Sequence, residues 1–369
     1  MRVLIAPDKF AGTLTAVEAA NAIAEGWSER APADELDLAP MADGGPGFVS
    51  VLHASLGGEL VAGTVRGPLG EPTPVSVLLH DRTAYVESAQ ACGLHLVDPT
   101  ERDPANASSY GVGESVLAAL ETGADRIVVG LGGSATNDGG AGMLAALGAT
   151  ADVPLDRGPN ALPGIGAADV DAARKRLAEV DLVMATDVDN VLLGMFGATK
   201  VFGPQKGIDD ADIPRIDGLL DRYVVAVCGA TPAQRRAADA PGAGAAGGLG
   251  FAMVLLGATR ESGIDLVAAA AGVPALAGRC DVVVTGEGAY DFQSRSGKVV
   301  YGVAQVAAEA LRPCVVLAGQ VLVGSREMRA MGIESAYSMV DLVGEERALE
   351  DPASSLRALA SRVARTWSR

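Results

Sequence analysis

The sequence predicts an α/β fold with parallel sheets, and three observations carry this prediction. Residues 3–6 form a short apolar run, Thr15-Ala16-Val17-Glu18 matches a helix capping box, and residues 36–38 supply a second strand, which together make a β-α-β unit. The alternation of strands and helices returns after residue 111 and again after residue 280. The chain has 369 residues, so at about 150 residues per domain we expect two domains.

The other elements follow from hydrophobic periodicity. Apolar or alternating runs predict strands over residues 61–65, 75–79, 84–86, 126–129, 182–185, 280–285 and 315–318. Apolar residues at helical spacing predict helices over residues 17–27, 111–120, 143–147 and 300–311. Short β-like runs between Gly-Pro turns at residues 57–86 indicate a change of domain, and the Pro and Gly of residues 151–168 predict a surface excursion.

Charge and composition exclude several classes of function. Lys plus Arg is 29 and Asp plus Glu is 46, a net charge of −17, so neither nucleic acid nor an anionic membrane is expected as a partner. The four cysteines stand far apart and there are only three histidines, so no zinc site is expected. The first apolar run ends at Asp8, too early for a signal peptide, and no run approaches the roughly 20 residues of a membrane span. We therefore expect a cytoplasmic protein.

Glycines and carboxylates follow several predicted strands, where ligands bind in open α/β sheets. Gly130-Leu131-Gly132-Gly133-Ser134-Ala135 fits the pattern G-x-G-x-x-G/A between a strand and a helix. Three interpretations stay open: an anion held by loop amides and the helix N-terminus, a tight structural turn, or a nicotinamide site. Residues 242–247 repeat the pattern without a preceding strand, which leaves either close packing of backbones or a helix N-terminus facing a ligand.

Charged side chains near the strand ends favour phosphoryl transfer. Asp187 and Asp189 follow a predicted strand and offer hard oxygen ligands for Mg²⁺ or a general base, although such residues also form turns. Lys206 and Lys298 stand among turn residues, where a lysine either clamps a phosphate or carboxylate or is simply solvated. No G-x-S-x-G motif surrounds a serine, so a Ser/His hydrolase is not expected.

Eight motifs in a fixed order carry a resemblance to a known family. They are APDKFAGTLT at 6–15, PMADGG at 40–45, SYG at 109–111, GLGGSATNDGG at 130–140, DVDN at 187–190, FGPQKG at 202–207, GAGAAGG at 242–248 and TGEG at 285–288. Together they resemble the type I glycerate kinases of bacteria from residue 3 to about residue 319. The resemblance implies ATP- and Mg²⁺-dependent phosphorylation of D-glycerate, most often to 2-phosphoglycerate. We expect a monomer or a homodimer.

The resemblance also implies two α/β domains. One is flavodoxin-like, with a Rossmann-like parallel sheet built from both chain ends, and the other is inserted between them. We place the first at residues 1–66 and 286–369 and the second at residues 67–285.

On this hypothesis the motif residues take three roles. The ATP phosphates are held by a glycine-rich loop and by the helix that follows it. The loop residues assigned to this role are Gly132, Gly133, Ser134, Asn137, Asp138 and Gly139. The catalytic candidates are Asp187, Asp189, Lys9 and Asp291, with Asp189 as the metal ligand. The substrate-binding candidates are Asp8, Asp43, Lys206, Glu287 and Lys298.

Four positions depart from the family pattern. Ala11 and Ala289 stand where the family commonly has Lys and Arg, and Pro46 and Phe48 interrupt its Asp-Gly-Gly-Glu-Gly-Thr motif. These departures motivate two alternatives, a kinase of another small hydroxy acid and a non-catalytic ligand-binding homologue. A third alternative, an NAD-dependent oxidoreductase, would use the loop at Gly130–Ala135.

Overall fold

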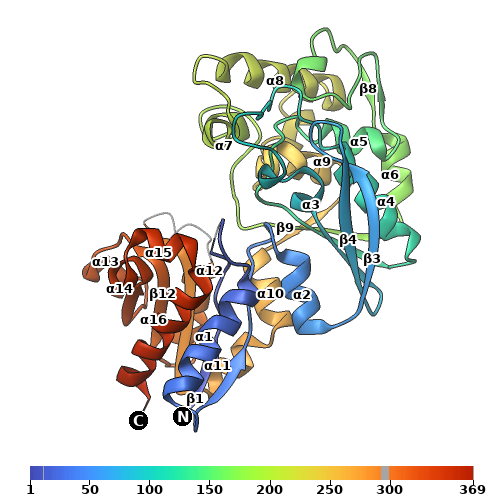
Figure 1. Cartoon of the computed structure of the whole chain (residues 1–369). Coiled ribbons are helices and arrows are strands. Elements are labelled where there is room, and N and C mark those ends of the chain that lie inside the picture. Colours follow the sequence, from blue (N-terminus) through green and yellow to red (C-terminus); the bar gives the residue numbers. More distant parts are fainter. Residues whose placement is uncertain (11, 292–298, 369) are drawn as a thin grey trace. The chain divides into compact units, whose positions relative to one another are not determined.

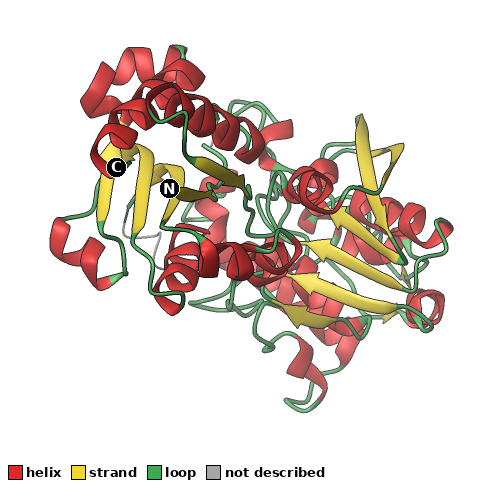
Figure 2. Cartoon of the chain, turned by 90° about the horizontal axis from the view of Figure 1, so that it is seen from below, coloured by secondary structure: helices red, strands yellow, loops and turns green. Residues whose placement is uncertain are grey.

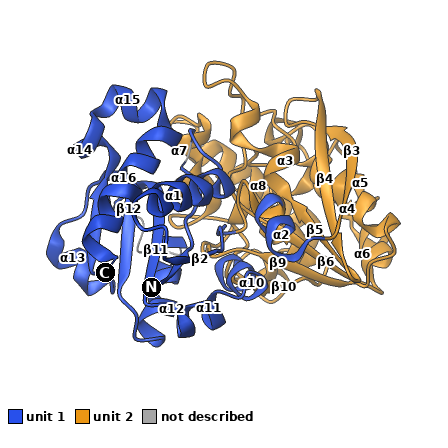
Figure 3. Cartoon of the chain, turned by 60° about the horizontal axis from the view of Figure 1, so that its bottom comes forward, with its two compact units in different colours: residues 1–43, 50–57, 263–369 blue, residues 44–49, 58–262 orange. Residues whose placement is uncertain are grey.

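The computed structural model describes residues 1–10, 12–291 and 299–368 (Figure 1). Strands and helices alternate along the chain, which confirms the predicted α/β class. The chain divides into two compact units, which Figure 3 shows in different colours. Unit 1 comprises residues 1–43, 50–57 and 263–369, and unit 2 comprises residues 44–49 and 58–262.

Unit 1 contains a parallel sheet of five strands in the order β13-β12-β11-β1-β2. Their bounds are β1 (Arg2–Ile5), β2 (Glu35–Leu38), β11 (Val282–Tyr290), β12 (Cys314–Val321) and β13 (Ser335–Ser338). Numbered along the chain, this is the 2-1-3-4-5 order of flavodoxin-like sheets, in which the strand order reverses between β1 and β11. Ligands of such folds bind outside the carboxyl ends of the strands at that reversal.

Helices cover both faces of this sheet, as Figure 2 shows. Val3 and Ile5 of β1 belong to the core under α1 (Ala16–Arg30) and α16 (Pro352–Trp367), whereas α11 (Val273–Arg279) and α12 (Val299–Glu309) contact β1 and β11. The predicted capping box is present, because Thr15 and Glu18 exchange hydrogen bonds at the start of α1. The other helices of unit 1 are α10 (Gly263–Ala270), α13 (Ser325–Ala330), α14 (Met339–Val343) and α15 (Glu345–Glu350).

Unit 2 contains a mixed sheet of six strands in the order β10-β9-β6-β5-β4-β3. Their bounds are β3 (Glu59–Arg66), β4 (Pro72–His80), β5 (Thr83–Glu87), β6 (Arg126–Gly130), β9 (Asp181–Ala185) and β10 (Thr259–Glu261). Strands β5, β6, β9 and β10 are parallel, and β4 runs antiparallel to both β5 and β3. The carboxyl ends of β3, β5, β6, β9 and β10 therefore lie at the same edge of the sheet. The remaining strands, β7 (Thr150–Ala151) and β8 (Ala168–Asp169), form a short hairpin.

The helices of unit 2 surround one large apolar core. They are α3 (Ser88–Cys92), α4 (Tyr110–Glu121), α5 (Ala141–Ala146), α6 (Asp171–Leu177), α7 (Ala198–Lys206), α8 (Ile213–Cys228) and α9 (Leu249–Leu255), with short 3₁₀ turns η1 (Leu94–Leu96), η2 (Pro159–Ala161), η3 (Gln234–Ala237) and η4 (Ala245–Gly248). Helix α2 (Phe48–Leu56) begins in unit 2 and ends in unit 1. Within the described ranges no helix is long and apolar enough to cross a membrane.

The boundaries of the two units differ from the expected ones at residues 66 and 286, and strand pairing explains the difference. Strand β3 pairs with β4 along its whole length and so belongs to the sheet of unit 2, whereas β11 pairs with β1 from Val282 and belongs to unit 1. Strand β11 also runs on through Gly286 to Gly288, where the sequence predicted a loop. The reason is close packing, because a Cβ on Gly286 would lie 2.1 Å from the carbonyl oxygen of Leu317 on β12. The glycine permits the strand here and does not end it.

Candidate functional site

A glycine-rich loop follows β6 at the carboxyl edge of the unit 2 sheet. A Cβ on Gly132 would lie 2.8 Å from Gly45 Cα, and a Cβ on Gly133 would lie 2.8 Å from Pro46 Cδ. Gly133 also has a φ of +62°, so the loop needs glycine at this position for both conformation and space. Within the described residues, the amides of Gly132 and Gly133 have no hydrogen-bond partner in the protein. Such unpaired loop amides are suited to an anion.

The sequence assigned Asp138 to phosphate binding, but its carboxylate accepts hydrogen bonds from the protein itself. Its buried carboxylate accepts hydrogen bonds from Ser109 N at 2.9 Å, Ser109 Oγ at 2.8 Å, Gly140 N at 3.0 Å and Gly142 N at 3.2 Å. Burial raises the pKa of Asp138, and these four hydrogen bonds act in the opposite direction. Helix α5 is therefore closed at its N-terminus by the protein's own carboxylate. This corrects the interpretation that this helix N-terminus holds an anion.

Lys206 lies beneath the same loop. It is the last residue of α7, where the sequence predicted a turn, and it is 2% exposed. Its Nζ donates hydrogen bonds to Ser134 Oγ at 3.0 Å and to Thr136 O at 2.6 Å. Burial lowers the pKa of Lys206 to about 8, although the nearby Asp138 favours the charged form. A cation is thus fixed directly against the loop that carries the two available amides.

Residues 242–248 pack against this loop. A Cβ on Gly247 would lie 1.9 Å from Thr136 O, and the Gly139 amide donates to Gly247 O at 3.0 Å. Of the two interpretations of this glycine motif, the structure supports close packing of backbones. On the other side of the loop, Asn137 Nδ2 donates to Thr199 Oγ1 at 2.9 Å, and both side chains are buried. No local pattern marks Thr199 as a site residue, because it lies 62 residues further along the chain.

The two acidic residues after β9 have different surroundings. Asp187 is half-buried, and its Oδ1 accepts a hydrogen bond from Ser262 Oγ at 2.7 Å. Asp189 has a side chain that is 80% exposed and forms an ion pair with Arg260 Nη1 at 2.7 Å. Ser262 and Arg260 lie at or just after β10, which is parallel to β9. Neither partner could be predicted from the sequence, because only the pairing of β9 with β10 brings them next to the aspartates.

A magnesium site is compatible with this edge of the sheet. Among the residues that the structure describes, no three His, Cys, Asp or Glu side chains are grouped so that they could hold a metal ion. Mg²⁺ commonly takes one or two protein carboxylates and completes its shell with phosphate oxygens and water. The carboxylate of Asp187 is half-buried and oriented by Ser262, whereas that of Asp189 is exposed, so Asp187 is better positioned to hold the ion.

A second polar group lies in unit 1, after β1 and β2. Lys9 Nζ is 3.6 Å from Asp8 Oδ1 and 3.7 Å from Asp43 Oδ1, and the Lys9 amide donates to Asp8 Oδ1 at 2.7 Å. The Asp8 amide donates to Gly286 O at 2.8 Å, so Asp8 stands at the strand-order reversal between β1 and β11. Burial raises the pKa of Asp8 to about 6, although Lys9 lowers it. The structure thus brings together Asp8, Lys9 and Asp43, as three of the predicted site residues.

The other predicted residues of unit 1 lie on or after β11. Glu287 is a buried residue of that strand, and Asp291 directly follows it. Ala289 lines a pocket of about 260 Å³ together with Phe10, Thr13 and Gln320. Lys298 and Ala11 lie outside the described residues.

The raised pKa of Asp8 predicts a pH-dependent stability difference between the wild type and Asp8→Asn. Between about pH 4 and pH 6 the folded state keeps the Asp8 proton that the unfolded chain loses, so the contribution of this group to stability falls as pH rises through that window. Asn does not ionise. We therefore expect the free energy of unfolding of Asp8→Asn, relative to the wild type, to rise by up to about 3 kcal/mol from pH 4 to pH 7. Urea unfolding at four pH values measures this, and a constant difference would contradict it.

The structure around the Gly130–Ala135 loop does not fit a nicotinamide site. A dinucleotide site needs a second parallel strand that ends in an acidic residue about 20 residues on. At that position β7 has two residues and pairs antiparallel with β8, and Asp152 accepts hydrogen bonds from the Gly166 amide. The loop is therefore not part of a Rossmann dinucleotide unit.

Comparison with known proteins identifies the family of the chain. The model of the Glycerate kinase family matches residues 3–368. The chain belongs to the glycerate kinase family. It is 40% identical over 351 residues to the glycerate 2-kinase of Escherichia coli K12, which covers 93% of this chain and 92% of that protein. An uncharacterized protein of Mycobacterium bovis is 42% identical over 369 residues, covering 99% of this chain and 91% of that protein.

A solved structure gives the same result. A crystal structure from Salmonella typhimurium LT2, assigned as a glycerate kinase 2, superposes with a TM-score of 0.79 at 37% identity and covers 99% of this chain and 98% of that chain. The resemblance seen in the sequence motifs is therefore confirmed, and so is the expectation that the chain is a kinase of this family. Pro46 and Phe48, which depart from the family pattern, pack against Gly133 and the Tyr85 ring respectively.

Proposed function

We propose that this protein is a glycerate kinase that uses ATP and Mg²⁺ to phosphorylate D-glycerate, giving 2-phosphoglycerate. Membership of the family supports the reaction class. The observation that carries the proposal is the loop at residues 131–137, where Lys206 is fixed beneath two available glycine amides. Phosphoryl transfer needs this kind of positioned positive charge, because its transition state spreads negative charge over the phosphate oxygens.

The proposed roles in unit 2 concern the phosphates and the metal. The amides of Gly132 and Gly133 bind phosphate oxygens, and the ammonium of Lys206 neutralises charge while it holds Ser134 and Thr136 in place. Asp187 is the carboxylate that would hold Mg²⁺, and Ser262 orients it. The metal supplies further charge neutralisation at the phosphate oxygens.

The proposed roles in unit 1 concern the acceptor. Lys9 offers an ammonium to the carboxylate of glycerate, and Asp8 and Asp43 fix the position of that ammonium. Only the ionised form of Asp8 attracts the Lys9 ammonium. We therefore expect the binding of glycerate by Lys9 to depend on pH near 6. Roles for Glu287, Asp291 and Lys298 stay predictions, as do the cytoplasmic location and the oligomeric state.

The decisive experiment is ADP release by the purified protein with Mg-ATP and D-glycerate. Reactions without acceptor, without metal and with other small hydroxy acids serve as controls, and chromatography separates 2-phosphoglycerate from 3-phosphoglycerate. We expect glycerate-dependent ADP and 2-phosphoglycerate. Folded protein that binds ATP but releases ADP only with another hydroxy acid would correct the acceptor, and no release with any acceptor would favour the non-catalytic alternative.

A further inference from the structure

A pocket of about 430 Å³ opens at the end of β3 in unit 2, and its lining includes none of the residues assigned to phosphoryl transfer. Its polar lining comes from two arginines, one aspartate and two small polar residues, namely Arg66, Arg157, Asp156, Asn106 and Ser108. None of its lining residues belongs to the loop at 131–139 or to residues 187–189. The pocket is therefore a separate feature of the same unit.

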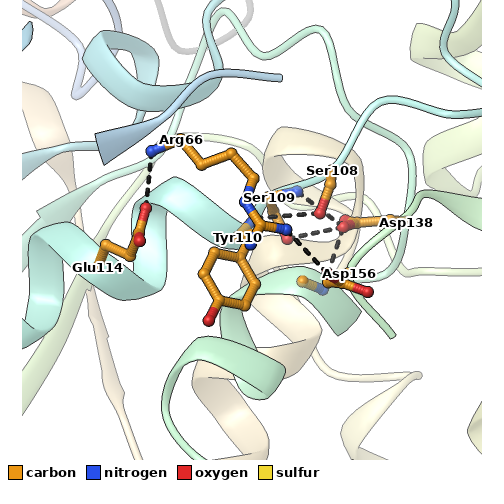
Figure 4. Close-up of polar contacts among 8 residues, drawn as sticks. Arg66, Ser108, Ser109, Tyr110, Glu114, Asp138 and Asp156 are labelled. Carbon is orange, nitrogen blue, oxygen red and sulfur yellow. Dashed lines mark hydrogen bonds and ion pairs between the residues drawn. The ribbon is translucent and has the colours of Figure 1, made fainter. Parts of the chain in front are cut away.

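The guanidinium of Arg66 is held rigidly at this pocket. It lies 3.8 Å above the Tyr110 ring, and its Nη1 donates to Asp156 Oδ2 at 2.8 Å, as Figure 4 shows. The Arg66 backbone amide donates to Glu114 Oε2 at 2.7 Å. Within the described part of the chain, its Nε and Nη2 have no protein acceptor. A ligand would meet donors that are already oriented, which reduces the entropic cost of binding.

The floor of the pocket is also fixed. Ser108 is 4% exposed, its amide donates to Pro68 O at 2.8 Å, and its Oγ accepts from the Tyr110 amide at 3.3 Å. The adjacent Ser109 binds the buried carboxylate of Asp138 (Figure 4). The Ser108 hydroxyl proton has no acceptor among the described residues, which adds a third donor beside the two arginines.

The charge of the pocket contrasts with that of the protein. Arg157 is exposed and has no ion pair within the described ranges, so Arg66, Arg157 and Asp156 together carry one net positive charge in a chain of net charge −17. Arginine binds phosphate with two parallel hydrogen bonds. A phosphate monoester has three terminal oxygens, which match Arg66, Arg157 and the Ser108 hydroxyl, whereas a carboxylate has two.

We propose that this pocket binds the phosphate group of a small phosphate monoester between Arg66 and Arg157. The volume exceeds that of one phosphate and leaves room for the organic part of such a ligand. The inference does not rest on the proposed kinase activity, because none of the groups involved is assigned to that reaction.

The test measures the melting temperature against inorganic phosphate concentration at constant ionic strength. The wild type is compared with Arg157→Gln, Arg66→Lys and the control Arg236→Gln, an exposed arginine of η3 in the same unit. Phosphate bound elsewhere raises the melting temperature of all four proteins equally, so it does not contribute to the difference between them. We expect phosphate to raise the melting temperature of the wild type and of Arg236→Gln by about 2 °C or more beyond the rise in the two pocket variants.

Two outcomes would overturn the proposal. One is an equal phosphate-dependent rise in all four proteins, and the other is an equal rise when chloride replaces phosphate. Arg157 is exposed and makes no ion pair that the structure describes. We therefore expect Arg157→Gln to fold like the wild type, so a loss of the phosphate effect in this variant cannot come from unfolding. The readout does not require turnover, so it is independent of whether ADP is released in the kinase assay.

Discussion

Asp187→Asn is expected to lower kcat for glycerate-dependent ADP release by about 10³-fold without unfolding the protein. Asn keeps the size of the side chain and an oxygen that can accept the 2.7 Å hydrogen bond from Ser262 Oγ. It removes the negative charge that we assign to Mg²⁺. Steady-state kinetics at saturating Mg-ATP and glycerate measure the loss, and thermal unfolding monitors the fold.

Asp189→Asn is the matched control, two residues away in the same loop. Its side chain is 80% exposed and its charge is paired with Arg260, and such exposed pairs contribute roughly 0–1 kcal/mol. We expect its kcat to stay within about threefold of the wild type. If Asp189→Asn lost as much activity as Asp187→Asn, or more, then the metal ligand would be Asp189, as the sequence alone suggested. Wild-type turnover in Asp187→Asn would remove Asp187 from the mechanism.

Lys206→Met is expected to lower kcat by about 10²-fold in protein that is still folded. The methionine has a similar length but carries no charge, so the loop at Ser134 and Thr136 loses the cation that lies within 3.0 Å. Met cannot donate hydrogen bonds to Thr136 O and Ser134 Oγ, so we also expect the melting temperature to fall. Kinetics are therefore measured below the melting transition of the variant, which separates the loss of function from the loss of folded protein.

Lys200→Met serves as the control on the same helix. Lys200 has a side chain that is 45% exposed, and it pairs with Asp210 at 3.4 Å, so we expect its loss to leave kcat unchanged. A second readout is the pH profile. Because the pKa of Lys206 is lowered to about 8, the wild-type rate should fall as pH rises through 8, and this decline should be absent in Lys206→Met. An Lys206→Met variant with wild-type kcat contradicts the assigned role.

The sequence correctly predicted the helices and strands that are stabilised by residues close together in the chain. The capping box at Thr15 and Glu18 is satisfied within four residues, and the apolar residues 127–130 of β6 are all buried, so each carries its own signal. The prediction was wrong at residues 202–207, where Pro and Gly suggested a turn. There α7 continues through Pro204 to Lys206, because a buried lysine and a Gly203 packed on Ile208 stabilise the last turn.

The motifs by themselves determined the family and the loops that carry its glycines and carboxylates. What each charged residue does was decided only by the tertiary structure, because its partner is distant in the chain. Ser109 approaches Asp138 from 29 residues away and turns a predicted phosphate ligand into a structural carboxylate. Arg260 reaches Asp189 only because β10 is parallel to β9. Lys206 becomes a buried cation under the glycine loop through contacts with residues 70 and 72 positions earlier, and no local pattern encodes contacts of that separation.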